Sequence, residues 1–128
     1  MKILNLTQHS TSLDQKKVGV IDLLPNHLKS LKELLTFTEV PAQIDLEVRA
    51  YQLVQMIIEN YSSKRVMIGG APFFMPHLER ELKEVGIQPM YAFSKREASE
   101  KDGVKTSTFQ HKGFVMVKMK GFKRALKE

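Results

Sequence analysis

The stretch from Arg65 to Phe93 reads RVMIGGAPFFMPHLERELKEVGIQPMYAF and contains the clearest pattern in the chain. It opens with a short apolar segment, Arg65–Ile68, which is typical of a buried strand. A tight turn follows at Gly69–Pro72, and apolar residues then recur at helical spacing until Gly86. Gln88–Phe93 is a second apolar strand. A strand, a helix and a strand joined by short loops form a right-handed βαβ unit, so the stretch predicts an α/β fold with parallel strands.

Before this unit, the sequence predicts one more strand and three helices. Ile3–Leu6 is a short apolar strand, and Ser12 is placed to cap a short helix that ends near Gly19. Pro25 opens a second helix. A third helix is predicted for about residues 42–60, where apolar residues follow a 3.6-residue period.

After Phe93 the pattern changes. Ser94–Lys101 is charged and polar, and it predicts a loop at the carboxyl end of a strand. Asp102–Gly103 is a hairpin-turn signal. Val104–Thr108 and Phe114–Met119 alternate weakly, which indicates two antiparallel strands at one edge of the sheet.

Together these elements predict a Rossmann-like three-layer α/β sandwich, with a mostly parallel sheet, helices on both faces and a C-terminal antiparallel hairpin. A length of 128 residues fits a single domain, 1–128, ending in a basic tail from about residue 118. The chain has no cysteine, so disulfides, thiolate metal sites and a cysteine nucleophile are excluded. The first residues are too short an apolar run for a signal peptide, and no run of about 18 apolar residues occurs. We therefore expect a cytoplasmic protein with no membrane partner.

The formal net charge of +6 favours anionic partners. Much of the excess lies near the carboxyl terminus, where acidic residues are almost absent. Nucleic acid is one such partner, although a solvated tail that aids solubility explains the same pattern and is favoured. The basic residues in this region are Lys112, Lys118, Lys120, Lys123, Arg124 and Lys127.

Two polar segments fall where parallel strands end. Gly69 and Gly70 lie between a strand and a helix amino terminus, where backbone amides can approach a phosphate. The alternative is a tight connection in which larger side chains would clash. Ser94, Lys95 and Arg96 follow the strand that ends at Phe93 and suit phosphate oxygens, because arginine can grip two of them at once. The alternative there is a solvated charged loop.

Two of the four histidines are candidates for proton transfer near neutral pH. His9 follows the first strand, and His111 lies in the segment FQHKG. His27 and His77 fall in predicted helices and are expected at the surface. The histidine spacing matches no zinc site, and no Gly-x-Ser-x-Gly elbow is present, so we expect no metal, no cofactor and no acyl transfer.

Several polar strings resemble a known family. MYAFSKRE (Met90–Glu97), DGVK (Asp102–Lys105) and FQH (Phe109–His111) look like the carboxyl-terminal signature of small CRISPR-associated ring nucleases, and LNLTQH (Leu4–His9) is similar to that family's first strand. The resemblance implies a CARF-like fold and a homodimer. It also implies binding of a cyclic oligoadenylate, most often cyclic tetra-adenylate, and metal-independent opening of the ring by a ribose 2′-hydroxyl.

On that resemblance, the catalytic residues are expected to be His111, Arg96 and His9. The ligand-binding residues would be Thr7, Gln8, Gly69, Gly70, Ser94, Lys95 and Glu97. Two alternatives stay open: a nucleotide-binding protein that senses or sequesters without cleaving, and a nucleic-acid-binding accessory protein that uses the basic tail.

Overall fold

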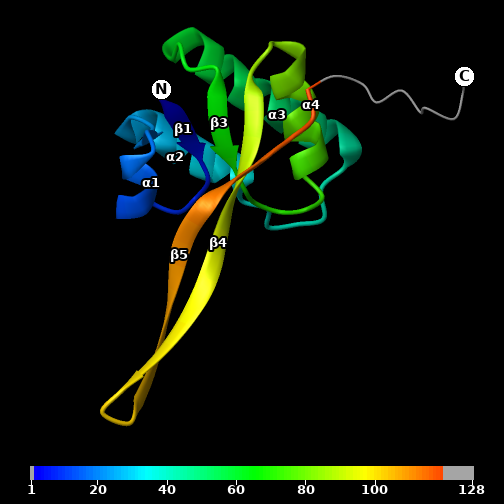
Figure 1. The fold of residues 1–128 in the computed structure, drawn as a ribbon. Coiled ribbons are helices and arrows are strands. Elements are labelled where there is room, and N and C mark those ends of the chain that lie inside the picture. Colours follow the sequence, from blue (N-terminus) through cyan, green and yellow to red (C-terminus); the bar gives the residue numbers. More distant parts are fainter. Residues whose placement is uncertain (1, 120–128) are drawn as a thin grey trace, which may run out of the picture.

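The computed structural model describes residues 2–119 of the chain. Within them, strands and helices follow one another, with two successive helices before the third strand, up to a long carboxyl-terminal hairpin (Figure 1). The strands are β1 (Ile3–Leu6), β2 (Val20–Asp22), β3 (Arg65–Ile68), β4 (Gln88–Lys101) and β5 (Val104–Met116); the helices are α1 (Leu13–Lys17), α2 (Pro25–Leu35), α3 (Gln43–Asn60) and α4 (Met75–Glu84).

The strands form one mixed sheet in the order β2-β1-β3-β4-β5. β1 pairs in parallel with β2 and β3, β3 pairs in parallel with β4, and β4 and β5 are antiparallel. Leu4 is opposite Val66, and Val66 is opposite Pro89. The predicted parallel strands are therefore confirmed, and an antiparallel hairpin is present. The prediction of two strands at Val104–Thr108 and Phe114–Met119 is wrong, because the single strand β5 runs through the first segment and into the second, and it pairs with β4. β2 has no predicted counterpart, because Val20 is its only buried residue and no apolar run marks it.

The helices begin where the sequence predicts. Ser12 and Gln15 form a capping box at the start of α1, each side chain bonding to the other's backbone amide. Pro25 occupies the first turn of α2, where its missing N–H costs no hydrogen bond. α3 buries one apolar stripe against the rest of the molecule. Local signals therefore fix the helix boundaries to within a residue or two.

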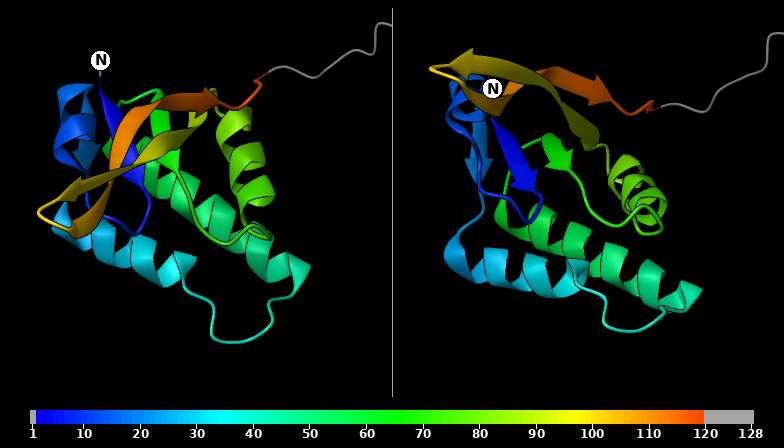
Figure 2. Two further views of the ribbon diagram at one scale, coloured as in Figure 1. Left: turned by 60° about the horizontal axis from the view of Figure 1, so that its bottom comes forward. Right: turned by 90° about the horizontal axis from the view of Figure 1, so that it is seen from below.

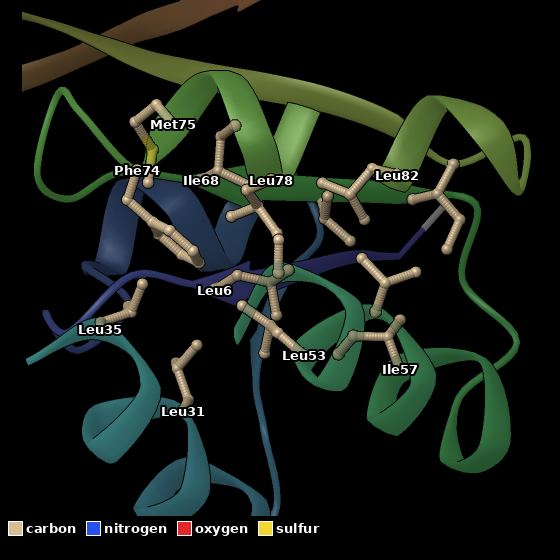
Figure 3. Packing of buried hydrophobic residues seen from close by; sticks show 14 of the residues in the cluster. Leu6, Leu31, Leu35, Leu53, Ile57, Ile68, Phe74, Met75, Leu78 and Leu82 are labelled. Carbon is tan, nitrogen blue, oxygen red and sulfur yellow. The ribbon is translucent and has the colours of Figure 1, made fainter. Parts of the chain in front are cut away.

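The main core lies between one face of the sheet and helices α2, α3 and α4. Leu6 and Ile68 point from the strands toward side chains of all three helices, including Leu31, Leu53 and Leu78 (Figure 3). All five are buried. Truncating any such leucine to alanine costs about 2–5 kcal/mol, so this face carries most of the stability of the fold.

α4 is also tied to β4 by a polar contact. The Tyr91 hydroxyl donates to Glu79 Oε2 at 2.5 Å. Burial, followed by this bond to a carboxylate, raises the pKa of Tyr91 well above its usual range. The phenol therefore stays protonated and remains a donor at physiological pH.

The second face of the sheet differs from the predicted three-layer arrangement. Its core is a small cluster of Ile3, Val20, Met67 and Met90, with Phe114 packed against it. Among the helices of residues 2–119, only α1 lies beside this face, and it buries no residue. The sheet curls into a half-barrel, with α2 and α3 on one side of β1 and β3 and the hairpin on the other (Figure 2). This face is therefore a concave surface, where the sequence predicted a third layer made of helices.

The prediction of a loop at Ser94–Lys101 is wrong. β4 continues through this segment and pairs with β5 along its whole length, so the two strands form a ribbon that runs beyond the other strands (Figure 1). We call residues 94–112 the ribbon. Apart from Gln110 and His111, which are half-buried at its base, its residues are exposed on both faces, so no apolar alternation marks it in the sequence. The turn at Asp102 and Gly103 is confirmed, and both residues have positive φ, as a type I′ hairpin turn requires.

Most of the predicted basic tail lies outside the described residues. No helix among residues 2–119 is both long enough and apolar enough to cross a membrane.

Candidate functional site

β1 and β3 are adjacent and parallel, so the segments that follow them meet at one edge of the sheet. We call the residues after these strands, Thr7–His9 and Gly69–Gly70, the carboxyl edge. The Thr7 Cγ2 atom lies 3.3 Å from the position that a Cβ would take at Gly69, which is tighter than ordinary van der Waals contact. Only a glycine fits at position 69 without displacing Thr7. The structure therefore brings together two of the segments that the sequence singled out.

A buried amide organises the first of these segments. Asn5 is 2 % exposed, and its Oδ1 accepts hydrogen bonds from the backbone amide of Thr7 at 2.9 Å and from the Thr7 hydroxyl at 2.7 Å. Its Nδ2 donates to the carbonyl of His9 at 2.7 Å. The turn that carries Thr7, Gln8 and His9 is thus held from inside by one side chain.

The same network reaches β2 through Asp22. Its Oδ1 accepts from Asn5 Nδ2 at 3.0 Å, from the Thr11 hydroxyl at 2.6 Å and from the Thr11 amide at 3.3 Å. Partial burial raises the pKa of this carboxyl. The bonds from Thr11 and Asn5 and the nearby Lys16 charge lower it more, so the pKa lies below its ordinary 3.8. Asp22 is therefore ionised at neutral pH and fixes the loop as an acceptor.

Sequence reasoning did not single out Asn5, Thr11 or Asp22 as one polar network. Asn5 carried a usable signal, because a polar residue inside a short apolar strand needs buried partners. Asp22 carried none, since its strand was not recognised.

The glycine turn is a weaker anion site than the sequence predicts. The amides of Phe74 and Met75 both donate to the carbonyl of Ala71, and Pro72 and Pro76 have no N–H. The amino terminus of α4 therefore offers few free donors. At Gly69 the turn brings its backbone close to the Thr7 loop, with no side chain between the two.

The other predicted residues lie on the ribbon. Ser94 is opposite His111 and Arg96 is opposite Phe109, with a register shift between Phe93 and Ser94. The Arg96 and Lys95 side chains are exposed. Because the ribbon leaves the sheet beside the ends of β1 and β3, its base begins at the level of the carboxyl edge (Figure 1).

Glu97 is engaged on the same ribbon. Its carboxylate lies 3.4 Å from the Lys112 ammonium, which also donates to Gln110 Oε1 at 3.2 Å. Both charged side chains are more than 40 % exposed, so this pair stabilises the ribbon only slightly. Glu97 thus balances the charge of Lys112. Lys95 and Arg96 are the two residues that precede Glu97 in the strand.

The two candidate histidines lie on different surfaces. The His9 side chain is exposed at the carboxyl edge. His111 lines a cavity on the concave face with Ile3, Lys17 and Met90, and its ring packs against Phe114 with centroids 4.7 Å apart. Both ring nitrogens of His111 are buried and have no hydrogen-bond partner among the described residues. Of the two, only His9 contacts Thr7, whose hydroxyl donates to the His9 carbonyl at 3.2 Å.

Within residues 2–119, no group of three or more His, Asp or Glu side chains is arranged to hold a metal ion. A family model described as the Uncharacterized protein MJ1673 family matches residues 1–115. No curated protein and no solved structure matches the chain.

Proposed function

We propose that this chain, which belongs to the Uncharacterized protein MJ1673 family, binds a cyclic oligoadenylate at the carboxyl edge and linearises it without a metal ion. The observation that carries the proposal is the meeting of the Thr7 loop with Gly69, at the ends of two adjacent parallel strands. Ligands of open α/β sheets bind at this position. The Rossmann-like, CARF-like reading of the fold belongs to the same proposal.

The cations at the base of the ribbon suit the phosphates of such a ligand. Arg96 presents a planar fork that can hold two phosphate oxygens. Lys95 is the next residue of the same strand and points to the opposite face of the ribbon, so it adds only longer-range positive charge. Thr7 and Gln8 supply polar side chains at the edge, and Gln8 already reaches the carbonyl of Leu35 at 3.5 Å. Ser94 and Glu97 flank the two cations along the strand.

The protein contributes to this reaction mainly by positioning the reacting groups of the ligand, which supplies its own nucleophile. The 2′-oxygen of one ribose forms a bond to the adjacent phosphorus, the bond to the 5′-oxygen breaks, and the product ends in a 2′,3′-cyclic phosphate. The proton of the 2′-hydroxyl must leave and the 5′-oxygen must gain one. His9 stands at the carboxyl edge, so we assign this proton transfer to His9 rather than to His111. Arg96 stabilises the charge that develops on the phosphate oxygens.

The proposed site includes a second copy of the chain. A two-stranded ribbon with both faces exposed is only marginally stable in water, so residues 94–112 need a covering surface. A cyclic ligand with repeated adenosines matches a two-fold axis, at which each protomer supplies the same groups. We therefore propose a homodimer in which the ribbons lie against the partner and the two carboxyl edges face one ligand.

A binding protein that does not cleave is the second candidate. Among residues 2–119 the His111 ring has no hydrogen-bond partner that would fix its tautomer, and the His9 side chain is exposed. Neither histidine is oriented as a general base usually is. This arrangement favours tight binding with slow or absent turnover.

Calorimetric titration with cyclic tri-, tetra- and hexa-adenylate tests the binding step. We expect one of the rings to bind, and Arg96→Ala to weaken that binding by well over tenfold, as loss of a charged donor does. Arg96→Lys should restore only part of the affinity, because the bidentate fork is lost. Lys101→Ala is the matched control, an exposed cation farther along the same strand, and it should bind normally. Equal losses for Arg96→Ala and Lys101→Ala would contradict the assignment.

A further inference from the structure

The proposed function leaves two cavities of the molecule unused. One has a volume of about 720 Å³ and lies at the amino-terminal ends of the strands, between Lys2, Tyr61 and Lys64. The other has a volume of about 530 Å³ and lies between α1 and β5, at Lys17 and Phe114. Each falls within the range of about 300–1,000 Å³ that small-molecule sites occupy.

The two cavities adjoin at Arg65 and Met116, which line both of them, so together they make an elongated space that runs from Lys64 to Phe114. We call this space the concave groove. An elongated ligand fits it better than a compact one.

The groove is strongly basic. Asp14 is the only carboxylate among the described residues that line it. Lys112 is paired with Glu97, which does not line the groove and balances the Lys112 charge. The cations that line the groove are Lys2, Lys17, Lys64, Arg65 and Lys112.

The floor of the groove is apolar and includes an aromatic ring. Ile3 and Met90 are buried there, and Phe114 is partly buried against them. His111 packs on Phe114, and its two ring nitrogens are buried without a hydrogen-bond partner in the described part of the chain. Burying ring nitrogens without a hydrogen bond costs free energy, which a ligand bonded to them would recover. A flat, hydrogen-bonding group stacked beside Phe114 would satisfy both features.

We propose that the concave groove binds single-stranded nucleic acid, with phosphates along its line of cations and a base against Phe114 and His111. Grooves that bind single strands combine these two elements, a basic track and a stacking ring. The groove contains no residue of the carboxyl edge and shares only His111 and Lys112 with the ribbon, so its test is separate from that of the cyclic oligoadenylate site.

Fluorescence anisotropy with labelled oligouridylate and oligothymidylate of about twelve nucleotides tests the proposal. The full chain is used throughout, so its basic carboxyl terminus contributes equally to every variant. Lys17→Ala/Lys64→Ala should lower the slope of log affinity against log salt by about 1.4, which corresponds to roughly twentyfold weaker binding at about 0.1 M salt. Lys29→Ala/Lys32→Ala, which removes two exposed cations from α2, is the matched control and should leave both quantities unchanged.

Phe114→Leu tests the stacking contact, because leucine keeps the apolar floor. It should weaken binding by about tenfold without changing the salt slope. Circular dichroism and the melting temperature confirm that each variant is folded. Equal effects of the two double variants, an unaffected Phe114→Leu, or a duplex bound as tightly as the single strand would overturn the proposal.

Discussion

The methyl group of Thr7 lies 3.3 Å from the position that a Cβ would occupy at Gly69, across the ends of two parallel strands. This contact makes the two loops of the carboxyl edge interdependent. Gly69→Ala should destabilise the protein by about 1–2 kcal/mol, because the added methyl must displace Thr7.

Thr7→Ser removes that methyl and keeps the hydroxyl that donates to Asn5. In the Thr7→Ser background, Gly69→Ala should therefore cost at least about 0.5 kcal/mol less than in the wild type. Urea denaturation of the four proteins of this double-mutant cycle gives the coupling. Strictly additive free energies would show that the two loops do not touch.

Asp22 should make stability depend on pH in the acid range. Its folded pKa is lowered by the bonds from Thr11 and Asn5, so the ionised form is favoured in the folded state. That contribution is present above about pH 4 and is lost as the pH falls through the folded pKa. Asp22→Asn should be less stable than wild type at neutral pH, and the difference should shrink in acid. A difference that stays constant in thermal melts across this range would contradict the network.

His9 and His111 should behave differently in the proposed reaction. His9→Ala should slow ring opening by about a hundredfold while leaving ligand affinity nearly intact, as removal of a proton-transfer group does. His111→Ala is the comparison, and it should keep the rate per folded molecule within about twofold, because His111 lies on the concave face. Single-turnover assays separate these rates from binding. If only His111→Ala lost activity, the proton-transfer assignment would move to His111.

The ribbon should be required for dimer formation. Arg96 and Phe109 are register partners, so residues 97–108 can be replaced by an Asn-Gly turn that joins them. Neither core cluster contains a side chain from the removed segment, so the domain should stay folded. Sedimentation equilibrium should report a dimer for the wild type and a monomer for this variant. A wild type that is monomeric at micromolar concentration, with and without ligand, would refute the dimer.

The sequence predicted the parts of the fold that bury an apolar pattern. Periodicity and glycine placement predicted three consecutive features, the strand Arg65–Ile68, the turn at Gly69–Gly70 and the helix α4. Tertiary packing agrees with the local signal in this part of the chain. Ser12 and Pro25 marked helix starts for the same reason.

The parts that it did not predict lack such a pattern. The ribbon buries neither face, so its strands look like a charged loop until their backbone pairing is seen. The curl of the sheet, which leaves the concave face open to Lys17 and Arg65, comes from long-range packing that no local window encodes. In the candidate site, Thr7 and Gly69 lie close together, although the sequence singled out Gly69 by its position after a strand and Thr7 only through the family resemblance. No pattern in the sequence indicated that His111 faces the concave groove.

The most direct test of the proposed function is incubation of the full-length protein with labelled cyclic tetra-adenylate in EDTA, with products identified by mass spectrometry. We predict a linear oligoadenylate that ends in a 2′,3′-cyclic phosphate, formed by the wild type and strongly reduced in Arg96→Ala. Binding without any such product would support the non-cleaving alternative. Neither binding nor cleavage of the cyclic tri-, tetra- or hexa-adenylate would contradict the assignment of the carboxyl edge as a cyclic oligoadenylate site.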